Sequence, residues 1–256
     1  MLALVGHIRA AVLRVRLLVW LATTRLRLRF HGVDAELRFG RHVRWAELPG
    51  VRVTGGRGGR VAIEVGDNVD LGRLILIDVD GAARSTLRIG CDAMFEHAVR
   101  IQLLGGSLTL GDRCEVRDSA VLKVSSPDAR LTIGDQVKIG RGAAVHCHTE
   151  VTVEELVTLA ERITVVDSFH DVDGSDTWTM LSPLGSAPVR IERNAIVLSG
   201  AVIVHGTTIG RNAVVSANAL VPSGTHRPGV VLFGNPARTV RTLPAAPPPA
   251  PEPTDA

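Results

Sequence analysis

One of the nine histidines in the chain, His170, occupies a position suited to proton transfer. It opens a segment, residues 168–189, that contains acidic residues, Trp178 and two prolines but lacks the periodicity of the sequence around it. An imidazole titrates near neutral pH, so it can remove the proton of a hydroxyl group that attacks an electrophile. His170 is therefore a candidate general base; the alternative is an exposed loop histidine.

A general base is usually oriented by a hydrogen bond to its other ring nitrogen. Four nearby acids could accept that bond: Asp167, Asp171, Asp173 and Asp176. We rank Asp171 and Asp173 first. Each is equally explained as a solvated loop acid, and a backbone carbonyl could orient the ring instead.

Two further histidines, His146 and His148, alternate along an expected strand, so their side chains point to the same face. One interpretation is that they help to hold an acceptor or a developing oxyanion near the base. A metal site and two ordinary surface histidines are the other interpretations. No serine or cysteine motif typical of a nucleophile lies near His170, so we expect direct transfer without a covalent enzyme intermediate.

A six-residue repeat defines the elements that must position these side chains. Reading every sixth residue gives an unbroken aliphatic series: Ile191, Val197, Ile203, Ile209, Val215 and Val221. The residue four positions after each of the first five is small: Ala195, Ala201, Thr207, Ala213 and Ala219. Parts of the same register occur upstream, with a first turn expected at Val65, Leu71 and Ile77. The pattern predicts an all-β parallel β-helix in which a hexad is one strand and one corner, and three hexads form a triangular coil.

The repeat and its interruptions divide the chain. We expect a basic helix and lead-in segment over residues 1–60, with a short helix over about 2–22. The β-helix is expected over 61–226, interrupted by a long loop at 168–189, and is followed by a closing segment at 227–242. The Pro- and Ala-rich tail, 243–256, is predicted to be disordered.

Residues 1–33 contain six arginines and no acid, and their longest apolar run, Leu17 to Ala22, is far too short to span a membrane. The expected helix either docks peripherally on an anionic membrane surface or caps the β-helix. A net charge of +3 argues against nucleic-acid binding. Three widely spaced cysteines without a CxxC pair indicate reduced thiols and a cytoplasmic protein, peripheral on the inner membrane face if the helix docks.

Three stretches together resemble a known family. The run from Ile191 through Val221-Pro222 and the closing phrase Phe233-Gly-Asn-Pro-Ala-Arg238 resemble the end of a hexapeptide-repeat acyltransferase. The stretch Ile163-Thr-Val-Val-Asp-Ser-Phe-His170 resembles the segment that carries the catalytic histidine in the galactoside and maltose acetyltransferase branch. The resemblance implies a left-handed β-helix, a homotrimer and acetyl-CoA as the acyl donor. The handedness comes from the resemblance alone, since general crossover rules favour right-handed connections.

The resemblance also implies positions for the coenzyme. Ser199 and Ala217 stand where backbone groups of the family hold pantetheine, and small residues there allow close approach. Arg238, and less strongly Arg241 and Arg227, are candidates for phosphate contacts, because guanidinium groups bind phosphates through paired hydrogen bonds. The alternatives are ordinary corner packing for the small residues and a solvated terminus for the arginines.

We therefore expect an O-acetyltransferase that acts on a saccharide or a related hydroxyl acceptor, with no metal. In the expected trimer, His146 or His148 of one subunit faces His170 of another across a cleft. An amino-sugar N-acyltransferase on the same scaffold is the alternative. A zinc carbonic anhydrase-like trimer and a catalytically silent trimeric scaffold are further alternatives.

Overall fold

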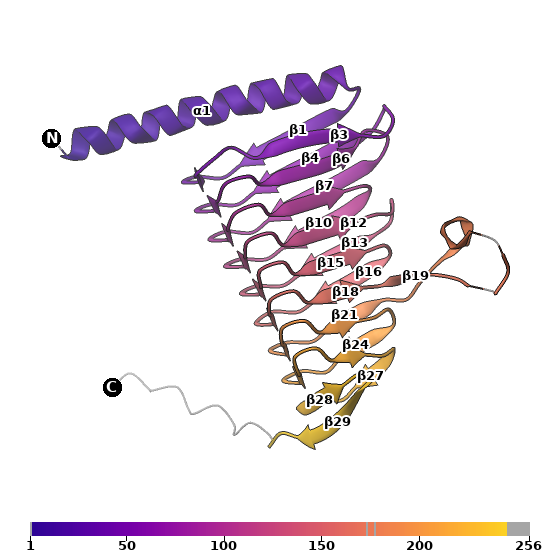
Figure 1. Cartoon of the computed structure of the whole chain (residues 1–256). Coiled ribbons are helices and arrows are strands. Elements are labelled where there is room, and N and C mark those ends of the chain that lie inside the picture. The colour runs from indigo at the N-terminus through magenta and orange to yellow at the C-terminus, as the bar shows by residue number, and fades with distance from the viewer. Residues whose placement is uncertain (1, 173, 177, 245–256) are drawn as a thin grey trace, which may run out of the picture.

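The computed structural model describes residues 2–172, 174–176 and 178–244, and the side chains from residue 15 onward. A long helix, α1 (Leu2–Phe30), lies across one end of a stack of β-coils, and three parallel sheets form the three faces of the stack (Figure 1). This architecture is the parallel β-helix that the hexad repeat predicts, in the left-handed form that the resemblance implies.

The strands of the three sheets follow one another around each coil. Sheet A consists of β1 (Asp34–Phe39), β4 (Arg60–Val65), β7 (Arg84–Ile89), β10 (Gly106–Leu110), β13 (Arg130–Ile133), β16 (Glu150–Val153), β21 (Val189–Ile191), β24 (Thr207–Ile209) and β27 (Gly224–His226). Sheet B consists of β2 (Arg44–Trp45), β5 (Asp70–Leu71), β8 (Met94–Phe95), β11 (Glu115–Val116), β14 (Lys138–Ile139), β17 (Thr158–Leu159), β22 (Ile196–Val197), β25 (Val214–Val215), β28 (Val230–Gly234) and β29 (Ala237–Thr242). Sheet C consists of β3 (Gly50–Thr54), β6 (Leu76–Asp80), β9 (Arg100–Leu103), β12 (Val121–Val124), β15 (Ala144–Cys147), β18 (Thr164–Val166), β23 (Val202–Ile203) and β26 (Leu220–Val221).

The hexad pattern sets the stacking register. Val197 pairs with Val215 in sheet B, and Ile203 pairs with Val221 in sheet C. These aliphatic side chains point into the prism and are fully buried, as are the small residues of the repeat, such as Ala201. Because every coil buries its faces only against its neighbours, the core is a continuous column along the stack.

The corners explain the recurring glycines and asparagines. A Cβ atom on Gly90 would lie 2.5 Å from the backbone of Gly111 in the next coil, so the coils stack closely only without a side chain there. Asn194 and Asn212 occupy equivalent corners with φ of 58°, a left-handed conformation that asparagine tolerates. The Asn194 side-chain amide donates a hydrogen bond to Asn212 Oδ1 at 2.8 Å, which links the two coils.

The N-terminal segment differs from the prediction in two respects. The helix is longer than expected and ends at Phe30, and the β-helix begins at Asp34 rather than at residue 61. The first coil keeps the six-residue spacing at Phe39, Trp45 and Val51, which pair in register with the turn that was expected to come first. It was missed because two of these three positions hold aromatic rather than aliphatic residues. Leu28 is buried against this coil and Trp20 Nε1 donates to the carbonyl of Pro49 at 3.0 Å, so the capping interpretation of the helix is correct. None of the described helices combines the length and the apolar character that crossing a membrane requires.

The C-terminal end closes with a hairpin. β28 still pairs in parallel with β25, so the stack continues past the expected boundary at residue 226. β29 then returns antiparallel to β28. The predicted disorder of the tail concerns residues 243–256, of which 245–256 lie outside the described residues.

The long interruption is a hairpin that leaves the stack. β19 (Ser168–His170) pairs antiparallel with β20 (Leu184–Ser186), and a short 3₁₀ helix, η1 (Thr179–Leu181), lies between them. We call residues 168–188 the excursion. It projects sideways from the corner where sheet C meets sheet A (Figure 1).

Candidate active site

The base of the excursion is fixed by one buried carboxylate, Asp167. It is 0% exposed and accepts three backbone hydrogen bonds, from the N–H groups of His148 and Thr149 at 2.7 Å and of Glu150 at 2.8 Å. The backbone carbonyl of Asp167 also accepts a bond from Ala187 N at 2.8 Å, which closes the neck of the excursion. Asp167 therefore joins the corner of one coil to both ends of the hairpin, and it is not available to orient His170.

His170 ends strand β19, paired opposite Leu184 of β20. Its Nδ1 atom is buried and has no hydrogen-bond partner among the described residues, whereas the residue as a whole is partly exposed. An imidazole that acts as a base through one nitrogen carries its proton on the other, and that N–H requires an acceptor. Among the described residues, no acceptor therefore orients the His170 ring through its Nδ1 atom.

Two acids were ranked first as that partner. Asp171 is exposed, and its backbone N–H donates to the carbonyl of Pro183 at 3.1 Å. The structure records no bond between the Asp171 carboxylate and the His170 ring within the described part of the chain. Asp173 lies outside the described residues, so its role stays a prediction.

A second histidine, His205, was missed by the sequence analysis. Its ring packs on the ring of Phe169 with centroids 4.2 Å apart and planes inclined by 32°. Phe169 in turn lies over Gly185, where an added Cβ would come within 2.4 Å of the ring. His205 is found by counting one coil forward from Asp167, because β23 stacks on β18 in register. It holds the hairpin against the stack.

His146 and His148 lie on the outer side of the coil beside the excursion, as predicted from their alternation. Burial, followed by the nearby positive charge of Lys123, lowers the pKa of His146 below its ordinary value, so its imidazole is predominantly neutral at physiological pH. His148 Nδ1 lies 3.3 Å from the hydroxyl of Ser125. Both side chains thus share the C–A edge with His170, where imidazole nitrogens can form hydrogen bonds to a polar acceptor.

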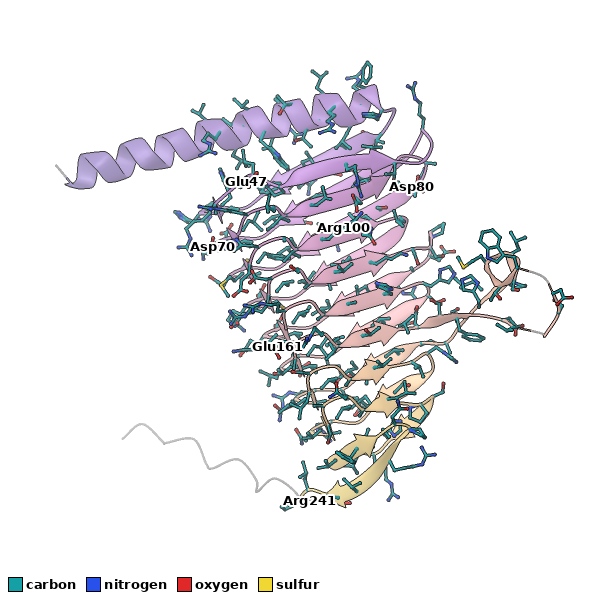
Figure 2. All side chains as sticks on the ribbon, in the orientation of Figure 1. Glu47, Asp70, Asp80, Arg100, Glu161 and Arg241 are labelled. Carbon is teal, nitrogen blue, oxygen red and sulfur yellow. The ribbon has the colours of Figure 1, made fainter. Side chains whose placement is uncertain are left out.

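The coenzyme candidates lie elsewhere on the prism. Ser199 and Ala217 occupy stacked corners between sheets B and C, and the N–H of Asn218 donates to the Ser199 carbonyl at 3.0 Å. The Ser199 hydroxyl also donates to Glu161 at 2.8 Å, and this bond lowers the pKa of the Glu161 carboxyl. Figure 2 shows Glu161 on the side of the stack opposite to the excursion.

One of the three candidate arginines extends this second edge. Arg238 pairs with Phe233 on the closing hairpin, one coil beyond Ala217, whereas Arg241 pairs with Val231 toward the other end of the sheet B strand. Arg227 lies in the connection between β27 and β28, at the corner between sheets A and B. The structure therefore groups Ser199, Ala217 and Arg238 and separates Arg227 from them.

The described residues contain no group of three or more His, Cys, Asp or Glu side chains arranged to hold a metal ion. The thiol nearest the site, Cys147, is buried, and burial raises its pKa to about 12. Its sulfur therefore stays protonated at neutral pH and has little nucleophilic character.

Comparison with known proteins supports the repeat. Residues 188–223 match the family described as bacterial transferase hexapeptide (six repeats), which confirms the predicted hexapeptide repeat in this part of the chain. A search of curated proteins found no match.

Several solved structures resemble the coil stack. An AntD variant, an N-acyltransferase from Bacillus cereus solved with dTDP and coenzyme A, is 16% identical over 61% of this chain and 84% of its own, with a TM-score of 0.46. The hexapeptide-repeat acetyltransferase VCA0836 from Vibrio cholerae, solved with acetyl coenzyme A, is 20% identical over 62% of this chain and 72% of its own, with a TM-score of 0.43. The polySia-specific acetyltransferase NeuO is 14% identical over 86% and 81%, with a TM-score of 0.47.

Proposed function

We propose that this protein is a CoA-dependent acyltransferase that moves an acetyl group from acetyl-CoA to a hydroxyl of a saccharide or related acceptor, with His170 as the general base. The observation that carries the proposal is the setting of His170. It lies on a hairpin clamped to a β-helix with the bacterial-transferase hexapeptide repeat, and its buried Nδ1 leaves the other ring nitrogen to act on a substrate.

The proposed reaction is a direct transfer. The neutral imidazole of His170 takes the acceptor hydroxyl proton while the hydroxyl oxygen attacks the thioester carbonyl carbon. The resulting tetrahedral oxyanion collapses with cleavage of the C–S bond, and the imidazolium returns its proton to the thiolate of CoA. The products are the acetyl ester and free CoA, and His170 is again neutral.

The arrangement of edges favours a site shared between copies of the chain. His170 projects from the C–A edge, whereas Ser199 and Ala217 lie on the B–C edge of the same chain. A second copy that places its B–C edge beside the excursion brings coenzyme and base together, and a threefold arrangement creates three such sites. Outward-pointing, half-buried apolar side chains of sheet C provide a surface for this contact: Val166, Val202, Val204 and Leu220.

The coenzyme is proposed to run along the B–C edge, with its pantetheine beside Ser199 and Ala217 and its phosphates toward Arg238 and Arg241. Both arginines are exposed on β29, so their guanidinium groups can reach a phosphate without leaving a buried partner unpaired. His146 and His148 of the subunit that supplies His170 are proposed to line the acceptor end of the site. We place the reaction in the cytoplasm, where acetyl-CoA is available.

A screen for thiol release from acetyl-CoA tests the proposal. The full-length protein is incubated with acetyl-CoA and, separately, with sugars and nucleotide sugars that carry only hydroxyl groups or also a free amine. We expect acceptor-dependent release of CoA with a hydroxyl acceptor and one acetyl group added per CoA, as checked by mass spectrometry. Turnover only with acceptors that carry a free amine would show that the protein is an N-acyltransferase rather than an O-acetyltransferase. Absence of both turnover and acetyl-CoA binding would refute the proposal.

The oligomer is tested separately by light scattering coupled to size-exclusion chromatography. The proposal expects three copies per particle. A monomer that retains turnover would contradict the shared site but would not affect the proposed role of His170 as the general base.

A further inference from the structure

The capping helix α1 has two apolar faces rather than one. The inner face, formed by Leu17, Trp20, Leu21, Thr24 and Leu28, packs on the first coil. On the opposite side, a second row is exposed by between 57% and 79%: Val15, Leu18, Val19, Leu26 and Phe30. At about 100° per residue, these five residues fall on one side of the helix, opposite the inner face. We call them the outer face of α1.

The flanks of the outer face are basic. At about 100° per residue, Arg16 and Arg27 fall along one flank, and Arg25 and Arg29 along the other. The Arg25 side chain donates to the carbonyl of Leu37 at 2.7 Å, whereas the guanidinium groups of Arg16, Arg27 and Arg29 have no recorded ion pair or hydrogen bond in the described part of the chain. The whole helix contains no aspartate or glutamate. An apolar ridge between unpaired cations has the composition of a helix that lies in a lipid headgroup layer.

The position of α1 leaves this face open to a plane. Figure 1 shows the helix lying across the end of the stack as the outermost element there, with the coils all on one side of it. A flat surface can therefore reach the whole outer face without meeting the coils or the excursion. Two outer faces packed against each other would instead bring their arginine flanks together, and like charges at short distance repel. The charge of the flanks and the open position of the helix therefore both favour an anionic lipid surface, rather than a second copy of the chain, as the partner of the outer face.

We propose that the outer face of α1 docks the protein on the surface of a bilayer that contains anionic lipids. Val15, Leu18, Val19, Leu26 and Phe30 enter the boundary between headgroups and acyl chains, and Arg16, Arg27 and Arg29 contact lipid phosphates. The inner face meanwhile keeps its contacts with the first coil. The same helix thus caps the β-helix and anchors it, and the site at the excursion stays in the aqueous phase. This inference is independent of the proposed acyl transfer.

Co-sedimentation of the full-length protein with lipid vesicles tests the docking. Vesicles of phosphatidylcholine containing phosphatidylglycerol are compared with pure phosphatidylcholine. We expect binding to the anionic vesicles only, weakened by salt because the contacts are electrostatic and exposed. Each arginine near such a surface contributes about a fivefold change in partitioning, so Arg16→Gln, Arg27→Gln and Arg29→Gln together lower it about a hundredfold. Leu18→Ser with Leu26→Ser lowers it while the arginines remain.

The matched control removes three exposed arginines of the coils that form no ion pair with any other described residue: Arg73→Gln, Arg84→Gln and Arg211→Gln. It changes the net charge by the same amount and is expected to retain binding. Phe30→Trp adds a positive readout, since its fluorescence shifts to the blue on insertion into anionic vesicles. Absence of vesicle binding, equal binding to both vesicle types, or equal loss in the control overturns the proposal. A change of oligomeric state in the Leu18→Ser, Leu26→Ser variant without vesicle binding assigns the face to a second copy.

Discussion

The carboxylate of Asp167 provides a direct test of how the excursion is held. The substitution Asp167→Ala removes the acceptor of three backbone N–H groups, those of His148, Thr149 and Glu150. All three bonds are short and the carboxylate is fully buried, so the donors keep no partner in the native arrangement. Loss of a hydrogen bond to a charged group costs roughly 1.5–3 kcal/mol, and water reaches part of the corner once the neck opens. We expect a loss of roughly 3–5 kcal/mol.

Two measurements give the size of this loss of stability and show which residues lose their protection. Urea denaturation gives the change in the free energy of unfolding, and hydrogen exchange read at residues 148–150 and 187 shows where protection disappears. Asp167→Asn keeps one oxygen, which can still accept up to two of the bonds, and therefore loses less. Asp171→Ala is the control and changes stability by less than about 0.5 kcal/mol, because its side chain is exposed. A loss below about 1 kcal/mol in Asp167→Ala, or unchanged exchange at residues 148–150, would refute the assignment.

Two further predictions concern titratable groups near the site. The pKa of His146 is lower in the folded protein than in the unfolded chain, so the unfolded chain binds a proton at this residue first as the pH falls. The free energy of unfolding therefore decreases as the pH drops from about 6.5, the ordinary pKa of histidine, toward the lower pKa of the folded state. Urea denaturation at about pH 7.5 and at about pH 5 measures this decrease in the free energy of unfolding. The decrease between the two pH values should be smaller in His146→Gln than in the unsubstituted protein, and an equal decrease would contradict the lowered pKa. The second prediction concerns the thiols, tested with an aromatic disulfide reagent at about pH 8. In the native protein, we expect no reaction at Cys147, whose pKa is raised to about 12, or at buried Cys114, so that at most Cys91 reacts. All three thiols should react after unfolding. Rapid native reaction of more than one thiol would show that the coil is more open than described.

The fold could be predicted from the sequence where the repeat is strict. From Ile191 to Val221, each hexad supplies one inward aliphatic and one small residue, and the strands pair in that register. The first coil was missed although Phe39, Trp45 and Val51 keep the six-residue period, because two of the three are aromatic rather than aliphatic. The second apolar face of α1 was missed for a different reason. Apolar residues on opposite sides of a helix cancel the one-sided pattern that marks an amphipathic helix.

The site could be predicted only in part, because a loop has no period. The position of His170 beyond the last residue of a coil was evident from the broken repeat, and the structure places it on a hairpin at a corner. The function of Asp167 as a clamp was not evident, since a carboxylate next to a histidine in sequence suggests an orienting partner. The contact of Phe169 with His205 depends on how the hairpin folds back over the next coil. The separation of Ser199 from His170 required the corners to be located in space.

The measurement that tests the central claim most directly is the steady-state kinetics of His170→Asn beside the matched control His42→Asn, an exposed corner histidine far from the excursion. With the acceptor identified in the thiol-release screen, we predict that His170→Asn lowers kcat by about 10²- to 10⁴-fold, the usual contribution of a general base, while the KM for acetyl-CoA changes little. The control should retain full activity. A His170→Asn protein that is folded and trimeric and keeps its kcat would contradict the assignment of His170 as the base.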